Sequence, residues 1–169
     1  NQVVRKIYNP YLFNVKIRKL NTIDDRNYIA WLGMFQHQKN LKELLNIVKK
    51  FPNVPFKIAG DINTKKLDIE TQTALIQLEE CTNVNFMGYL TRPEIGEFLS
   101  GALCLLNTSR YEGFSNTFLE AFDSGTPVVC LSSVDPDKII QNNGLGLTSD
   151  NYVDLPDIIE RVLLMAKSS

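Results

Sequence analysis

The sequence predicts an α/β fold in which a parallel sheet carries helices on both faces. Short apolar runs, typical of buried parallel strands, alternate along the chain with segments whose apolar residues recur at helical spacing. Because single helical segments separate the strands, the strands are expected to run parallel. The chain has 169 residues, which suits one domain with one sizeable core.

Strands and helices are expected in strict alternation. The strands are expected at residues 28–32, 54–59, 84–87, 102–106, 128–131 and 145–148. The helices are expected to include residues 41–48, 67–78, 93–99, 118–122, 139–140 and 155–162. Asn40 with Glu43 fits a cap for the first helix, and Gly125 followed by Pro127 is typical of a helix end. Residues 1–27 are expected to form a strand or linker that leads into a domain at residues 28–169.

Composition and charge exclude several classes of partner. A net charge of −1 and an isoelectric point of about 5.9 provide no basic field for nucleic acid or anionic lipid. No apolar run is long enough to span a bilayer and no signal peptide is visible, so we expect a cytoplasmic location. Cys104 and Cys130 lie in apolar runs outside any C-x-x-C motif and are expected to be buried free thiols. Because the chain begins with Asn1 and not Met, we expect a fragment or a processed product.

Glycines and polar residues follow the predicted strands, at the edge of the sheet where parallel α/β proteins bind ligands. These residues are Gly33 and Lys39, Gly60 and Asp61, Gly88, and the stretches 107–109 and 112–116. Each loop alone is a weak signal, because glycines occur in loops of every kind. Together they predict a ligand cleft on one edge of the sheet.

The loop that begins at Glu112 is expected to open a helix and to bind phosphate. Helix N-termini favour anions, and Gly113 would allow the backbone to approach a phosphate closely. Lys39 stands at another helix start, where a cation opposes the helix dipole unless an anion binds between them. Glu112 and Glu120 are suited to accept hydrogen bonds from the vicinal hydroxyls of a sugar and a ribose.

Each of these residues also has a purely structural interpretation. Thr117 and Glu120 fit a capping box, which on spacing alone is as good as a binding role. Glu112 fits an exposed loop carboxylate, and Lys39 a solvated lysine. The Asp135-Pro136-Asp137 sequence resembles a metal-binding D-x-D motif, but Asp135 as helix cap explains it better. We therefore predict no metal and no other cofactor, and His37, the only histidine, indicates no catalytic triad.

Residues 109–129 resemble the E-x7-E signature of the retaining glycosyltransferase family 4. The run EGFSNTFLEAFDSGTPVV at residues 112–129 matches the family's EGF, EA and GTPVV segments in order. Flanking matches occur in the expected order at residues 7–10, 33–40, 58–61 and 85–88, so that the resemblance covers almost the whole chain.

This resemblance implies the C-terminal, Rossmann-like half of a GT-B enzyme, the half that binds the nucleotide-sugar donor. The N-terminal domain, which binds most of the acceptor in this family, is not contained in the sequence. By the resemblance, Glu120 would hold the ribose, Glu112 would lie by the donor sugar, and Lys39 would bind the diphosphate and stabilise the leaving group without a metal. The full set of donor-binding residues implied in this way is Gly33, Lys39, Gly60, Gly88, Glu112, Gly113, Phe114, Ser115, Asn116, Thr117 and Glu120.

The sequence departs from the family pattern at three places. The family's phosphate-loop arginine falls on Met34, the glycine-rich loop after the fifth strand is replaced at residues 132–136, and Lys138 stands where an acidic residue is usual. The EGFSN variant resembles the form found in capsule and glycolipid transferases and favours a uridine diphosphate donor. For a full-length enzyme, a peripheral place at the membrane stays open.

Two other functions remain open beside hexosyl transfer to a glycan, lipid or protein. One is a nucleotide-sugar 2-epimerase, which shares the architecture but is not expected to carry the E-x7-E run. The other is a degenerate domain that binds a nucleotide sugar or a partner protein without transfer, which the departure at Met34 keeps open. A dinucleotide dehydrogenase is disfavoured, because no G-x-G-x-x-G follows the first strand.

Overall fold

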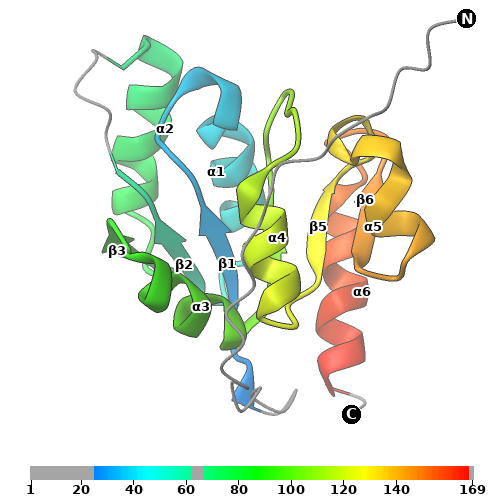
Figure 1. Ribbon diagram of the computed structural model, residues 1–169. Coiled ribbons are helices and arrows are strands. Elements are labelled where there is room, and N and C mark those ends of the chain that lie inside the picture. The colour runs from blue at the N-terminus through cyan, green and yellow to red at the C-terminus, as the bar shows by residue number, and fades with distance from the viewer. Residues whose placement is uncertain (1–24, 62–66, 168–169) are drawn as a thin grey trace, which may run out of the picture.

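The computed structural model describes residues 25–61 and 67–167, and these form a six-stranded parallel sheet (Figure 1). The strand order is β3-β2-β1-β4-β5-β6, and every observed pairing is parallel. The strands are β1 (Tyr28–Leu32), β2 (Phe56–Ala59), β3 (Val84–Gly88), β4 (Ala102–Leu106), β5 (Val128–Leu131) and β6 (Gly146–Ser149). The predicted parallel sheet is confirmed. Residues 1–24, expected to form most of the lead-in segment, lie outside the described residues.

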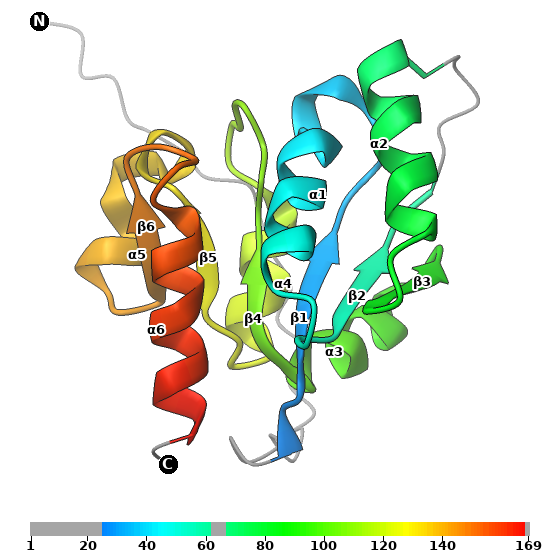
Figure 2. The ribbon, with the colours of Figure 1, turned by 180° about the vertical axis from the view of Figure 1, so that it is seen from behind.

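Helices cover both faces of the sheet, as predicted. The α-helices are α1 (Leu41–Lys50), α2 (Ile69–Glu79), α3 (Arg92–Ser100), α4 (Asn116–Asp123), α5 (Ile139–Asn142) and α6 (Leu155–Lys167). Short 3-10 turns occur at η2 (His37–Lys39), η3 (Ser132–Val134) and η4 (Pro136–Lys138). Helices α1, α2 and α6 lie on the face seen in Figure 2, and α3 and α4 lie on the face seen in Figure 1.

The direction of strand order reverses between β1 and β4. From β1 the chain adds β2 and then β3 on one side, and it later returns to add β4, β5 and β6 on the other side. The loops that leave the carboxyl ends of β1 and β4 therefore diverge to opposite faces of the sheet. In open α/β sheets, ligands bind beyond the carboxyl ends of the strands at such a switch point.

The core consists of the strands and the apolar stripes of the helices. Trp31, Phe56 and Phe118 are the largest of its fully buried side chains. Cys104 and Cys130 are buried free thiols, as the apolar runs predicted, and burial raises the pKa of the Cys104 thiol to about 12. A thiol with this pKa stays protonated and unreactive at neutral pH. None of the helices in the described residues has both the length and the apolar character needed to cross a membrane.

Two of the predicted helix ends have the expected contacts. Gly125 ends α4 with a φ of 63°, as expected for a glycine after a helix, and Thr126 then donates to the Ala121 carbonyl. The Asp135 carboxylate accepts hydrogen bonds from the amides of Ile140 and Gln141, so its predicted role as a cap is confirmed.

The predicted side-chain cap of α1 is wrong. Asn40 does occupy the N-cap position, but it adopts a left-handed conformation with φ 52° and makes no side-chain cap bond. A cap side chain reaches the next turn from an extended backbone, and the left-handed conformation points the Asn40 side chain elsewhere.

Candidate functional site

The loops after β1 and β4 meet above the switch point and are bonded to each other. The Arg110 amide donates to the Gln38 carbonyl over 2.8 Å, and the Thr108 hydroxyl donates to the Lys39 carbonyl, also over 2.8 Å. The first loop leads into α1 and the second leads into α4, so each loop ends at a helix N-terminus. Each of these N-termini carries a partial positive charge.

An ion pair between Lys39 and Glu112 joins the two loops. The Lys39 Nζ lies 2.5 Å from the Glu112 Oε1, and the two side chains are only 12% and 8% exposed. The Ser109 hydroxyl donates to the same carboxylate oxygen over 2.7 Å. Gln38 makes a longer contact of 3.4 Å with the other oxygen. The structure thus joins two residues that are 73 positions apart, which no local pattern in the sequence indicated.

Buried groups beneath Lys39 fix its position. The Trp31 indole N–H donates to the Thr108 hydroxyl over 3.0 Å, and Thr108 in turn holds the Lys39 carbonyl. The aliphatic part of Lys39 passes over Gly33, where an added Cβ would lie 3.3 Å from the Lys39 Cε. Trp31 and Thr108 are both buried. Trp31, Thr108 and Gly33 therefore support the lysine from below. The sequence alone did not reveal these contacts, because none of them joins residues that are neighbours in the chain.

Further contacts hold residues 108–110 of the loop after β4 in place. The Tyr152 hydroxyl donates to the carbonyls of Thr108 and Ser109, over 3.2 and 3.1 Å. The Arg110 guanidinium pairs with Glu70 of α2, and Lys42 of α1 lies 3.5 Å from the same carboxylate. Arg110 and Lys42 thus share one carboxylate partner.

Glu120 lies inside α4 and not at its cap. The N-cap of α4 is Ser115, so Thr117 is the second residue of the helix and Glu120 the fifth. The capping-box interpretation requires Thr117 at the N-cap and is wrong. Glu120 is partly buried, and this burial raises the pKa of its carboxyl, while the positive charge of Arg92 opposes the shift.

The glycines at the ends of β1, β2 and β3 lie next to one another. The Gly60 amide donates to the Gly88 carbonyl over 2.9 Å, and Gly88 has a φ of 68°. A Cβ on Gly60 would lie 1.9 Å from the Gly33 carbonyl oxygen, so close packing of backbone explains this glycine. A Cβ on Gly113, in contrast, would meet no atom within 4 Å. Crowding by the described residues therefore does not explain the glycine at position 113.

No cluster of three or more metal-ligating side chains occurs in residues 25–61 and 67–167. Asp135 of the D-x-D sequence is a helix cap, and His37 lies 3.8 Å from Asp68 on the surface. That the function needs no metal stays a prediction.

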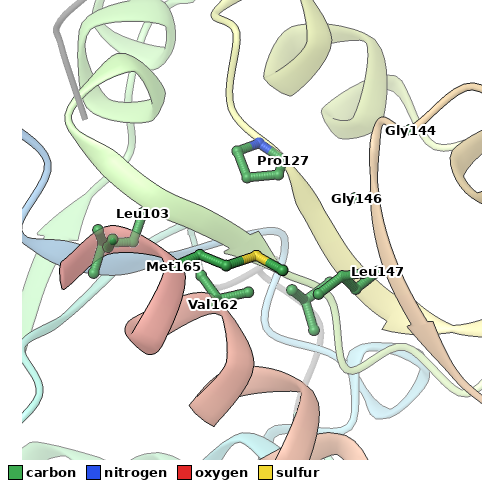
Figure 3. Close-up of a pocket in the computed structure, with 9 residues that line it drawn as sticks. Leu103, Pro127, Gly144, Gly146, Leu147, Val162 and Met165 are labelled. Carbon is green, nitrogen blue, oxygen red and sulfur yellow. The ribbon is translucent and has the colours of Figure 1, made fainter. Parts of the chain in front are cut away.

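A separate cavity of about 360 Å³ lies at the opposite, amino-terminal edge of β4, β5 and β6. Figure 3 shows Leu103, Val162 and Met165 around this space, between α6 and the sheet. Its lining is apolar and includes none of the residues expected to bind a donor.

The comparison with family models decides the family. A model described as "Glycosyl transferases group 1" matches residues 13–169. The chain belongs to the group 1 glycosyltransferases. The match includes the ion pair, the E-x7-E run and all of the sheet. A search of curated protein sequences found no match.

Solved glycosyltransferase structures share the fold of this group 1 domain. TarM of S. aureus, solved as a variant with fondaparinux, α-GlcNAc-glycerol and UDP, is 26% identical, with a TM-score of 0.66 over 90% of this chain and 32% of TarM. Anabaena HepE, solved with UDP-glucose, is 19% identical, with a TM-score of 0.69 over 83% of this chain and 40% of HepE. The C-terminal domain of a group 1 protein, LpcC of Francisella tularensis, is 18% identical, with a TM-score of 0.65 over 84% of this chain and 78% of that domain.

The chain therefore spans about a third of TarM, and it aligns with most of a domain that was solved on its own. The Rossmann-like fold of a GT-B glycosyltransferase is confirmed by these neighbours.

Proposed function

We propose that this chain binds the nucleotide-sugar donor of a retaining glycosyltransferase, with the diphosphate on Lys39. The observation that carries the proposal is the position of Lys39. Its side chain is only 12% exposed, it lies at the switch point of the sheet, and it stands just before the start of α1. A largely buried cation beside a helix N-terminus is suited to an anionic group of a ligand.

The remaining donor groups are assigned around this anchor. Glu112 would accept hydrogen bonds from the sugar hydroxyls, and Glu120 from the ribose hydroxyls. The backbone at Gly113, Phe114, Ser115 and Asn116 would line the diphosphate. The space beside Gly113 supports a close approach of ligand to backbone at this point. The base would lie near Gly88, next to Tyr89, whose ring is 74% exposed.

A uridine diphosphate donor is favoured by the ligands of the neighbours. TarM was solved with UDP and HepE with UDP-glucose. The acceptor, which is a glycan, lipid or protein group, would be bound mainly by a second domain across the cleft. In transfer, Lys39 and the helix dipoles would stabilise the departing nucleoside diphosphate without a metal. The retaining outcome and the family 4 assignment rest on the E-x7-E resemblance, and the cytoplasmic location stays a prediction from the sequence.

One observation favours a second candidate function, which is donor binding without transfer. Met34 stands where the family places an arginine, and it is 43% exposed in the loop after β1. The site then has a single cation for two phosphates, and the stabilisation of a leaving diphosphate is correspondingly weak.

Calorimetry with uridine, guanosine and adenosine diphosphates tests the proposal. We expect this chain to bind at least one of them and to transfer no sugar by itself. No binding of any of the three at millimolar concentration contradicts the donor-site assignment.

A further inference from the structure

We propose that Glu112 competes with the diphosphate of the ligand for the Lys39 ammonium, so that this carboxylate weakens the binding of nucleoside diphosphates. The inference rests on the proposed function and adds an opposing role for Glu112 toward one part of the ligand. Lys39 and Glu112 are bonded to each other in the structure. When a diphosphate binds, this ion pair must break, or the Lys39 ammonium must contact both anions.

The first argument is the balance of the charges on and around Lys39. Lys39 and Glu112 together carry no net charge, and the 2.5 Å contact between them lies where both side chains are almost fully buried. Of the neighbouring cations, Arg110 is paired with Glu70, and Lys42 lies beside the same carboxylate. Position 34 supplies no charge, because it is a methionine. At Lys39 an arriving diphosphate therefore meets a neutral ion pair, although the group formed by Arg110, Lys42 and Glu70 beside it keeps one net positive charge.

The second argument is that Glu112 is held in place. Its Oε1 accepts from both Lys39 and the Ser109 hydroxyl, and Ser109 is itself buried. The carbonyl of Ser109 is bound in turn by Tyr152. The carboxylate therefore does not swing freely away from Lys39. A phosphate that bound to Lys39 would lie close to this fixed negative charge, and like charges at low exposure repel each other strongly.

The sugar of a complete donor changes this balance. A sugar placed beside Glu112 offers hydroxyl donors, which replace the hydrogen bond that Lys39 gives up. A nucleoside diphosphate has no such hydroxyls near Glu112, and its terminal phosphate carries an additional partial charge, because the second pKa of a phosphate is about 6. The ion pair would therefore favour release of the diphosphate product after transfer.

The decisive variant is Glu112→Gln, which keeps the shape of the side chain and removes its charge. If Glu112 served only to bind the ligand, this change would weaken the binding of UDP or leave it unchanged. If Glu112 competes for Lys39, it strengthens the binding of UDP by about fivefold or more, because an exposed ion pair already contributes up to about fivefold and this pair is largely buried. Trp31 is the only tryptophan and is bonded through Thr108 to Lys39, so its fluorescence reports binding alongside calorimetry.

Three further variants make the test specific. Glu79→Gln removes the same charge from an exposed position at the end of α2, and it should leave the UDP affinity unchanged. Glu112→Ala should also strengthen UDP binding, and it serves if Glu112→Gln does not fold. Lys39→Met should weaken UDP binding, and in that background Glu112→Gln should give a clearly smaller gain, because only the direct repulsion between Glu112 and the phosphate is then relieved.

The outcomes separate this inference from the proposed function. If UDP, GDP or ADP binds the unchanged chain, and both Glu112 variants bind that nucleotide equally or more weakly, the competition is refuted and the donor site stands. A gain for Glu112→Gln that is equally large without Lys39 also refutes it. If no nucleotide binds either the unchanged chain or the Glu112 variants, both proposals fail. Binding that appears only in the Glu112 variants supports the competition.

Discussion

The α-carbon of Gly60 faces the carbonyl oxygen of Gly33 so closely that an added methyl group would lie 1.9 Å from that oxygen. The backbone of the second strand end thus packs directly on the loop that carries Lys39. In the same site, Gly113 has open space around its α-carbon and a φ outside the left-handed region. The two glycines therefore predict opposite effects of one substitution.

Gly60→Ala is expected to destabilise the fold, and Gly113→Ala is expected to weaken only ligand binding. In Gly60→Ala the clash with backbone forces the loop after β1 to move, at a cost of roughly 2 kcal/mol or more in the free energy of unfolding. Gly113→Ala should leave that free energy within about 0.5 kcal/mol. If the backbone at Gly113 contacts the diphosphate, nucleotide affinity should fall about tenfold. Denaturant unfolding and nucleotide titration of both variants measure the two effects, and unchanged affinity in Gly113→Ala contradicts the place given to the diphosphate.

Thr108→Val is expected to lower both stability and nucleotide affinity. The variant leaves the buried Trp31 indole N–H without its acceptor, which costs roughly 1–3 kcal/mol. It also removes the hydrogen bond that the Thr108 hydroxyl donates to the Lys39 carbonyl. Thr73→Val, at an exposed position of α2, is the matched control and should change neither quantity. A stable Thr108→Val protein with normal affinity would show that the hydrogen bonds below Lys39 do not position it.

Glu120→Ala is expected to weaken nucleotide binding without loss of stability. A carboxylate bonded to ribose hydroxyls contributes roughly 1.5–3 kcal/mol, which corresponds to a loss of affinity of about ten- to a hundredfold. Because Ser115 and not Thr117 is the N-cap, the helix loses no cap in this variant. A fall in stability with normal affinity would show that Glu120 has a structural role only.

The raised pKa of Glu120 also predicts how stability depends on pH. An acid whose pKa is higher in the folded state binds its proton more tightly there, so that its ionised form destabilises the fold. This penalty is complete above the folded-state pKa and absent below the unfolded value, for which 4.5 is the reference. Glu120→Gln should therefore raise the free energy of unfolding at pH 7, and the difference should shrink as the pH falls toward 4. A difference that grows at low pH would mean that burial does not dominate the shift.

The strands and helices were predictable because each has a periodic or continuous apolar pattern of its own. The strands at residues 28–32, 102–106 and 128–131 have the predicted limits, since buried parallel strands are apolar along their whole length. Helix starts were less certain. Thr117 and Ser115 both fit the N-cap of α4 by residue type, and only the backbone conformation distinguishes them.

The contacts within the site were not predictable in the same way. Lys39 and Glu112 were each selected from their loops, but their ion pair depends on the reversal of strand order between β1 and β4. The bonds of Trp31 and Thr108 beneath Lys39 also join segments far apart in sequence. A tryptophan in a strand and a threonine after a strand also occur in cores that have no binding site. Their residue types therefore did not indicate that they support Lys39.

Met34→Arg is expected to strengthen the binding of nucleoside diphosphates a few-fold. Met34 follows β1 in the loop that carries Lys39, and its side chain is 43% exposed, so it does not pack into the core behind the strand. An arginine there keeps its charge in water and should not destabilise the fold. Its planar guanidinium can bind two phosphate oxygens through two parallel hydrogen bonds, whereas the lysine ammonium lacks such a planar fork. Solvent screening and the ordering of a long side chain reduce the gain to a few-fold.

Met34→Gln is the matched control, because glutamine is close to methionine in length and is polar like arginine but carries no charge. Titration of both variants with UDP, next to their thermal unfolding curves, separates electrostatics from packing. A gain for arginine but not for glutamine, at an unchanged unfolding temperature, supports a phosphate site shared by Lys39 and position 34. Equal affinities for all three proteins would mean that position 34 does not face the diphosphate. The alignment of residues 33–40 with the phosphate loop of the family, and with it the role proposed for Lys39, would then lose its support.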